Sequence, residues 1–260
     1  MARKNFAENT SITAKISGGV NKIIYLAAYH HPDLVEKNPH VAWDVNVTAL
    51  SRFLNLAEGV DRFLYPSTDS VYGESVKEYK FKETDSLTPP NRYGIQKSCA
   101  EKLVTAYGYH VVRYPFLIGH SISPGKKHFY DTIVETISQG NAIDMFSDSY
   151  RSALDFDTAA RLTVDIMEKP AADVPQILNV CGDEALSKYE IGLRLAGLLG
   201  VPQSLVRPVS IQNQTDIFTV RRASSTLMDN TLMKRILGAD EVKINLSGAK
   251  ESPYYPPDEA

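Results

Sequence analysis

Short apolar runs alternate with longer amphipathic stretches through the first half of the chain. The runs, which predict buried strands, lie at 22–28, 62–68 and 110–114. Apolar positions spaced for one helix face extend from His40 to Ala57, and Gly59 closes that stretch. A second amphipathic stretch follows Asn91. Strands that alternate with helices long enough to serve as crossovers predict an α/β fold with a doubly wound parallel sheet.

The second half of the chain continues this pattern with a less regular rhythm. It predicts helices at 128–139, 158–167, 187–199 and 225–237, and a strand at 176–180. Ser187 and Glu190 form a capping box at the start of one helix, and Gly238 ends the last one. The segment 29–33 and the tail 253–257 are predicted to be irregular because both are rich in turn residues.

Composition argues against several classes of function. The 260 residues are 43% hydrophobic and 23% charged, as expected for a globular protein with one sizeable core, or one core and a small lobe. The net charge of −3 comes without a basic stripe, which argues against a nucleic-acid partner. Cys99 and Cys181 are the only cysteines, so neither a disulfide framework nor a cysteine metal site is indicated.

Signals for membranes, secretion and metals are absent from the sequence. No apolar run approaches the roughly 18 residues of a membrane span. The basic start, 1–4, is not followed by the apolar segment of a signal peptide. Asp33, Asp155 and Asp157 show no metal-ligand spacing. We therefore expect a cytoplasmic protein with no metal and no membrane partner, in keeping with the low cysteine content.

Tyr93 and Lys97 form the first candidate for chemistry. Two prolines precede Asn91, which is a good N-cap, so a helix should begin there and place Tyr93 and Lys97 one turn apart on one face. The helix dipole and the neighbouring ammonium should lower the Tyr93 pKa from about 10 towards neutrality. A tyrosine tuned in this way can exchange a proton with a substrate oxygen. Alone, the pair is equally well explained as a surface tyrosine and a solvated lysine.

Three further segments follow predicted strands directly. They are Ala27-Ala28-Tyr29, Ser67-Thr68-Asp69 and Tyr114-Pro115-Phe116. In open parallel sheets, ligands bind beyond the carboxyl ends of the strands. The helix of Tyr93 leads into the third strand, so these separate segments should meet at one edge of the sheet.

Together these residues resemble the extended short-chain dehydrogenases/reductases, a family of sugar-nucleotide epimerases, dehydratases and reductases, over roughly residues 20 to 240. The matching pieces, in family order, are Leu26-Ala27-Ala28, Asn46-Val47, the run from Ser67 to Gly73, Tyr93-x-x-x-Lys97, and Arg113-Tyr114. The Ser-Thr-Asp run, 148–152 and 221–227 look most like the dTDP-4-dehydrorhamnose reductase branch, whereas Val-Tyr-Gly at 71–73 is more typical of epimerases. Dehydratases carry Asp-Glu after the threonine, and here Ser70 follows Asp69, so dehydration is not expected.

The resemblance implies a Rossmann-like cofactor domain over 1–120 and 155–185, and a small substrate-binding lobe over 121–154 and 186–260. It implies that Tyr93 is the general acid/base, that Lys97 lowers its pKa and holds the nicotinamide ribose, and that Thr68 positions the reacting oxygen. NAD or NADP would carry the hydride, because no side chain can.

The resemblance also assigns binding residues. The implied cofactor-binding set is Ala27, Ala28, Tyr29, Asn46, Ser67, Tyr93, Lys97, Tyr114 and Phe116. The implied substrate-binding set is Thr68, Asp69, Arg151, Arg221 and Arg222, with Arg151 and one of the other arginines gripping a diphosphate. Plainer interpretations stay open: Ser67 and Thr68 as a strand end, Asn46 bonded to nearby backbone, and Arg151 in a surface ion pair.

One expected motif is missing. The family begins with a strand, a glycine-rich turn and a helix that hold the cofactor pyrophosphate, but the only early glycine pair, Gly18-Gly19, precedes the first predicted strand. The sequence could be a truncated one, could be completed by another chain, or could have lost cofactor binding. Without the preceding strands, the sheet should expose an edge near Ile23-Ile24.

Two hypotheses of different class follow. The first is an NAD(P)-dependent oxidoreductase or epimerase that acts on a nucleotide-linked sugar through Thr68, Tyr93 and Lys97. The alternative is a non-catalytic or truncated family member that binds a sugar nucleotide or a partner without using a nicotinamide. The resemblance further implies a homodimer formed through the helices 40–57 and 92–108.

Overall fold

The central element is a parallel sheet built from the predicted strands. The computed structural model describes residues 21–76, 78–122, 125–213 and 218–255. The strands β1 (Lys22–Ile24), β2 (Arg62–Thr68), β4 (His110–Tyr114) and β9 (Ile177–Asn179) lie in the order β1-β2-β4-β9, all parallel. The α/β prediction is confirmed. In the described part of the chain β1 pairs only with β2, so the other side of β1 is an open edge of the sheet near Ile23-Ile24, as predicted. The pair Gly18-Gly19 lies outside the described residues.

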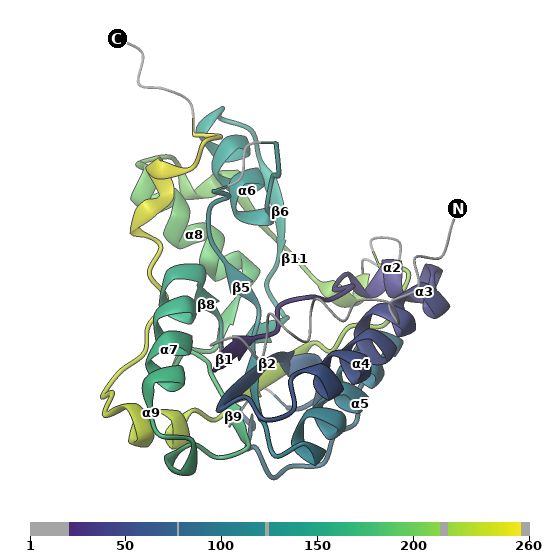
Figure 1. Cartoon of the computed structure of the whole chain (residues 1–260). Helices are drawn as coiled ribbons and strands as arrows, with labels where there is room; N and C mark the ends of the chain where they lie inside the picture. Colours follow the sequence, from purple (N-terminus) through teal and green to yellow (C-terminus); the bar gives the residue numbers. More distant parts are fainter. Residues whose placement is uncertain (1–20, 77, 123–124, 214–217, 256–260) are drawn as a thin grey trace.

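Helices cover both faces of this sheet (Figure 1). On one face lie α4 (Ala49–Leu56) and α5 (Arg92–Ala106), and on the other α7 (Phe156–Glu168) and α9 (Thr231–Leu237). Side chains alternate between faces along each strand. Phe63 and Val111 accordingly pack with the α4 and α5 cluster, whereas Leu64 and Val112 pack with the α7 and α9 cluster. Burial of these apolar residues on both faces explains why the strands read as continuous apolar runs.

The helix predicted from His40 to Ala57 is present but is not uniform. It consists of α3 (Pro39–Trp43), a π-helical segment (Asp44–Thr48) and α4. A short helix, α2 (Pro32–Lys37), precedes it and begins at the end of the segment 29–33, which was predicted to be irregular. Proline suits the first position of a helix, because its missing N–H would be unpaired there in any case. The π-helical turn matters for the site, because it carries the buried Asn46.

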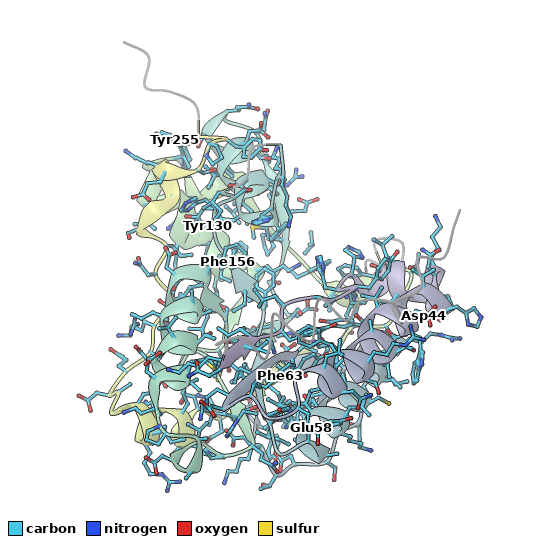
Figure 2. All side chains as sticks on the ribbon, in the orientation of Figure 1. Asp44, Glu58, Phe63, Tyr130, Phe156 and Tyr255 are labelled. Atoms are coloured by element: carbon cyan, nitrogen blue, oxygen red, sulfur yellow. The ribbon has the colours of Figure 1, made fainter. Side chains whose placement is uncertain are left out.

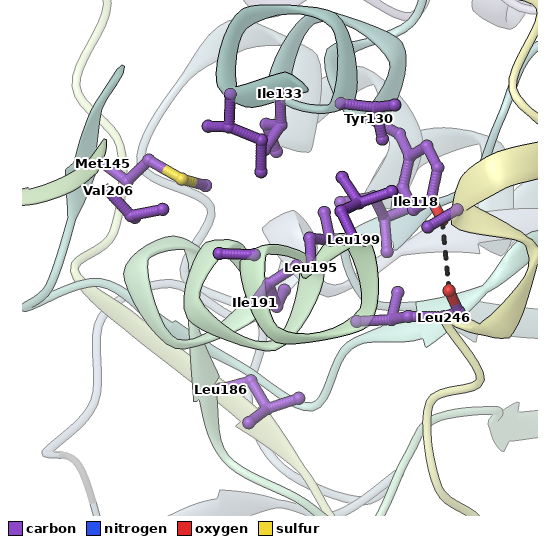
Figure 3. Close-up of a cluster of buried hydrophobic side chains, with 14 of the residues drawn as sticks. Ile118, Tyr130, Ile133, Met145, Leu186, Ile191, Leu195, Leu199, Val206 and Leu246 are labelled. Atoms are coloured by element: carbon purple, nitrogen blue, oxygen red, sulfur yellow. Dashed lines mark hydrogen bonds between the residues drawn. The ribbon is translucent and has the colours of Figure 1, made fainter. Parts of the chain in front are cut away.

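A second body contains most of the chain after Gly119. Its helices are α6 (Phe129–Ser138) and α8 (Lys188–Leu199), which pack on the parallel pair β6 (Ile143–Phe146) and β11 (Val206–Val209). Figure 3 shows the apolar cluster between them, tied by a 3.3 Å hydrogen bond from the Tyr130 hydroxyl to the Leu246 carbonyl. Tyr130 in this body and Phe63 in the sheet body mark two separate cores (Figure 2).

The predicted helix over 225–237 is wrong in its first part. Residues Ser225–Met228 form a strand, β12, which pairs in parallel with β7 (Tyr150–Arg151) and β3 (Lys80–Phe81). All four residues are buried, and their backbone groups are paired by those two strands. The helix α9 begins only after Asn230. Tertiary pairing between distant segments therefore overrides the local helical pattern.

Short elements complete the described chain. The remaining strands are β5 (Leu117–Ile118), β8 (Leu154–Asp155) and β10 (Leu186–Ser187). Turns of 3-10 helix lie at Asp69–Val71, Ala171–Asp173, Gln203–Leu205, Ile211–Asn213 and Ser247–Glu251. None of the helices within the described ranges has the length and apolar character needed to cross a bilayer.

A buried ion pair joins α5 to the centre of the sheet. The Arg113 guanidinium donates to the Glu101 carboxylate at 2.6 Å, and both side chains are at most 3% exposed. Arg113 also donates to the Tyr72 hydroxyl at 2.7 Å, which in turn donates to Asn179 at 2.8 Å. Glu101 further accepts a hydrogen bond from Ser67, at the end of β2. The network thus fixes the strand ends and α5 relative to one another.

We expect Arg113→Met to destabilise the protein by about 3–5 kcal/mol, because it leaves the Glu101 charge buried without a partner. Urea unfolding followed by circular dichroism measures this loss. The matched control is Arg161→Met, which removes an exposed pair 3.9 Å long and should change the free energy of unfolding by less than about 1 kcal/mol. Equal effects of the two substitutions would contradict the structural role of the buried pair.

Candidate functional site

A cavity of about 590 Å³ lies where the carboxyl ends of β2 and β4 meet the second body. This volume falls within the range of small-molecule sites. Ten of the residues predicted from the sequence line it: Ala28, Ser67, Thr68, Asp69, Tyr93, Lys97, Tyr114, Phe116, Arg151 and Arg222. The structure therefore brings the separate segments together at one edge of the sheet, as the strand order predicts.

The start of α5 is held against the loop after β2 by two local features. Asn91 caps the helix as predicted, its side chain accepting from the Gly94 N–H at 3.0 Å. At Gly94, a Cβ would lie only 2.4 Å from the carbonyl oxygen of Ser70. Only glycine allows this close approach, which places Tyr93 beside the end of β2.

Tyr93 and Thr68 meet in the cavity, and the Thr68 hydroxyl hydrogen-bonds the phenol. Thr68 also donates to Asp69 at 3.1 Å and accepts from the Ser70 N–H at 3.2 Å. Burial and the negative charge of Asp69 raise the pKa of Tyr93 above its ordinary value, although Thr68 opposes this. The predicted lowering of that pKa is wrong for this structure, in which the phenol keeps its proton at neutral pH.

Lys97 does not supply the charge that the sequence argument gave it. Its ammonium group donates to the carbonyl oxygen of Pro66 at 2.6 Å and lies 4.0 Å from the centre of the Tyr65 ring. Burial lowers the pKa of Lys97 to about 7, although the Glu101 carboxylate opposes the change. A lysine that is only partly protonated, and directed towards the sheet, has little effect on the Tyr93 pKa.

Four predicted residues do not line the cavity: Ala27, Tyr29, Asn46 and Arg221. Asn46 bonds both backbone groups of Tyr29, at 2.7 and 3.1 Å, and donates to Gln96 at 2.8 Å. These contacts favour the interpretation of Asn46 as a structural residue bonded to nearby backbone, because its polar atoms hold the loop after β1 against α5. Arg221 is 72% exposed, and its nearest acidic group is Glu74 at 3.7 Å.

The two arginines that do line the cavity already have acidic partners. Arg151 lies 3.3 Å from the Asp69 carboxylate and donates to the backbone carbonyls of Tyr150, Ala223 and Ser224. Arg222 pairs with Asp33 of α2 at 2.6 Å. Both side chains are about one fifth exposed, so neither belongs to a fully solvated surface pair.

Sequence reasoning missed the residues that the second body contributes. Lys188, Phe146 and Phe218 line the cavity opposite the strand ends. His30 and His31, in the loop after β1, line it as well, although the sequence favoured a solvated loop there over a substrate loop. The capping box at Ser187 identified Lys188 as the first residue of α8. The capping box could not show which side chains surround that lysine, because Phe116, Phe129 and Phe146 come from distant segments.

The described residues fit the nicotinamide end of a dinucleotide cofactor. Ala28, Pro66, Ser67, Lys97 and Tyr114 line this part of the sheet edge. The Ser67 hydroxyl is bonded to Glu101 and the Tyr114 hydroxyl to Thr163 of α7, while the Lys97 ammonium donates to the Pro66 carbonyl. The described chain contains no glycine before Gly59, so no described backbone turn of the glycine-rich type is available for a pyrophosphate.

Comparison with known families identifies the fold and the lineage. A family model described as the RmlD substrate binding domain matches residues 2–244. Methionine adenosyltransferase 2 subunit beta of Xenopus laevis is 28% identical over 196 residues, which are 72% of this chain and 57% of that protein. The mouse protein of the same name is 26% identical over 236 residues, 88% and 69% of the two chains. This chain thus spans less than two thirds of the first relative.

Solved structures agree on the architecture. The dTDP-4-dehydrorhamnose reductase of Bacillus anthracis, solved with NADP, has a TM-score of 0.77 and 20% identity, over 92% of this chain and 84% of that one. The UDP-glucuronic acid 4-epimerase of Bacillus cereus, solved with UDP-glucuronic acid and NAD, has a TM-score of 0.75 and 19% identity, over 95% and 78%. The predicted Rossmann-like fold is confirmed by these likenesses.

The buried state of Lys97 predicts a pH-dependent stability. Between a folded pKa of about 7 and an unfolded pKa of roughly 10.4, the unfolded chain binds more protons, so stability should rise with pH. Compared with Lys97→Met, the unaltered protein should gain about 2–3 kcal/mol between pH 6.5 and pH 9, measured by urea unfolding. The exposed Lys102→Met variant should show no such pH-dependent difference. Parallel pH profiles for Lys97→Met and the unaltered protein would contradict the lowered pKa.

Proposed function

Because the chain belongs to the RmlD substrate binding domain family, we propose that it is an NAD(P)-dependent oxidoreductase or epimerase acting on a nucleotide-linked sugar. The observation that carries this proposal is the meeting of Tyr93, Thr68 and Lys97 in one cavity that also holds cationic side chains. The names of the structural neighbours, a reductase with NADP and an epimerase with UDP-glucuronic acid and NAD, support the substrate and cofactor classes.

A protonated Tyr93 is the form that the reductive direction of this chemistry requires. A neutral phenol can give its proton to the oxygen of a sugar ketone as that oxygen gains negative charge. Thr68, already bonded to the phenol, would hold the same oxygen in place. A bound reduced nicotinamide would supply the hydride that adds to the carbonyl carbon. The products are then a sugar hydroxyl and an oxidised cofactor, and Tyr93 recovers its proton from solvent.

Each part of the chain has a role in this proposal. The sheet segments, 1–120 and 155–185, would form the cofactor domain, with Ala28, Ser67, Lys97 and Tyr114 beside the nicotinamide and its ribose. The segments 121–154 and 186–260 would form the substrate lobe. Both NAD and NADP remain candidates, because the neighbours were solved with one or the other.

A second candidate is a non-catalytic binding subunit of the same fold. Two observations favour it. The curated relatives carry the name of a subunit of methionine adenosyltransferase, and no described residue before Gly59 is a glycine that could form the usual phosphate-binding turn. On this proposal the cavity binds a sugar nucleotide and the chain serves a partner, so nicotinamide cofactors do not bind.

Substitution of Tyr93 tests the catalytic proposal. Tyr93→Phe removes the proton donor and should lower kcat by about 100- to 10,000-fold, with the fold intact. The assay follows oxidation of NADH or NADPH with dTDP-linked and UDP-linked 4-keto sugars. Tyr107→Phe, which removes a hydroxyl bonded to Asn55 on the outer surface, is the matched control. Turnover that survives in Tyr93→Phe would eliminate the proposed role.

Titration with NADH and NADPH, followed by fluorescence, separates the two candidates. Micromolar binding supports the enzyme. Absence of binding at millimolar cofactor, together with binding of UDP-glucose or another sugar nucleotide, supports the non-catalytic subunit.

We also infer a homodimer through the helices 40–57 and 92–108. Val41 and Trp43 on the first helix and Ile95 on the second are 54%, 43% and 46% exposed, and a partner subunit packed on these helices would bury them. Light scattering should give twice the chain mass, and Trp43→Glu should give a monomer. A monomer for the unaltered chain at micromolar concentration would refute the dimer.

A further inference from the structure

Lys188 is a cation of the cavity that has no acidic partner among the described residues, and unlike Lys97 it does not donate to a described backbone carbonyl either. Arg151 and Arg222 lie close enough for both charges to act on Lys188, yet each is paired with a carboxylate, Asp69 and Asp33 respectively. Within the described ranges, Lys188 takes part in no ion pair and donates no side-chain hydrogen bond. Its three N–H donors are therefore available to a ligand.

Three aromatic rings hold the Lys188 ammonium in place. Its nitrogen lies 4.6 Å from the centre of the Phe129 ring, 5.4 Å from that of Phe116 and 5.8 Å from that of Phe146. Rings at these distances attract the cation without neutralising it, so a positioned charge is presented to the cavity. Burial and the two arginines lower the pKa of Lys188 to about 8, and a bound anion would offset both effects.

A series of contacts connects the reacting centre with this charge. Tyr93 bonds Thr68, Thr68 bonds Asp69, and Asp69 pairs with Arg151. Lys188 comes after Arg151 in this sequence, on the wall that α8 contributes. Phe146 and Phe218, whose ring centres are 5.7 Å apart, line the cavity beside Lys188 and Arg222 and give it an apolar surface. An anionic group flanked by an apolar, planar group would match this wall.

We propose that Lys188 binds the diphosphate of a nucleoside diphosphate, with the attached sugar directed towards Thr68 and Tyr93. The inference rests on the proposed function in one respect, namely that the cavity accepts a nucleotide-linked sugar. It changes the assignment of the anion site, because Arg151 and Arg222 are already paired and Arg221 is outside the cavity. Lys188 thereby becomes a specificity-determining residue that favours diphosphate-bearing ligands over neutral nucleosides.

Calorimetric titration of the full chain with UDP and dTDP, and with uridine and thymidine, tests this inference. Lys188→Met keeps the side-chain volume and removes the charge, and it should weaken binding of both diphosphates by about 10- to 100-fold. Affinity for the nucleosides should stay the same. Lys188→Arg should recover most of the loss. Lys102→Met, on the exposed surface of α5, is the control for a change of net charge.

Two results would overturn the inference: equal diphosphate affinity in Lys188→Met and the unaltered protein, or no diphosphate binding at millimolar concentration. Urea unfolding of each variant distinguishes a binding defect from a folding defect. The NADH and NADPH titrations on the same proteins keep the two proposals separate. Diphosphate binding that depends on Lys188, without any nicotinamide binding, supports the anion site while refuting the oxidoreductase.

Discussion

The close approach of α5 to the loop after β2 is the constraint on which the site depends. It exists because Gly94 has no side chain to meet the carbonyl of Ser70. The parallel register of β2 with β4 then sets Thr68 opposite Tyr114. The buried pair between Glu101 of α5 and Arg113 of β4 holds this helix to the sheet. Geometry that is secured by backbone contact and by buried charge leaves Tyr93 and Thr68 little freedom to separate.

In this cavity the pKa values of the ionisable side chains are shifted more by burial than by nearby charges. The Tyr93 phenol, the Lys97 ammonium and the Asp69 carboxyl all have pKa values displaced towards their neutral forms. In each case desolvation is the leading cause, and the nearby opposite charges or hydrogen bonds compensate only in part. A ligand that brings charge into such a site changes protonation as well as contacts. The binding of a charged ligand is therefore coupled to the uptake or release of protons by these side chains.

The sequence predicted the sheet and most helices because their signals are local. Asn91, Ser187 and the apolar runs act within a few residues, and the structure follows them closely. Two kinds of feature could not be predicted. The strand over Ser225–Met228 exists because β7 and β3 pair with it. Likewise, the direction of the Lys97 ammonium depends on the Pro66 carbonyl, and the surroundings of Lys188 come from three separate segments. The predicted pKa of Tyr93 was wrong for this reason, because the prediction assumed that the Lys97 ammonium lies beside the phenol one helical turn away.

The ion pair between Asp33 and Arg222 has a consequence for how the chain folds. The two residues are 189 positions apart, so the contact closes most of the described chain into a loop. Closing so long a loop costs more chain entropy than closing a local contact, so we expect this contact to form after the helices and the pairs of neighbouring strands. The cavity wall is therefore completed only when both bodies have formed. A ligand in this cavity would therefore contact residues from both ends of the described chain, and its binding would stabilise their association.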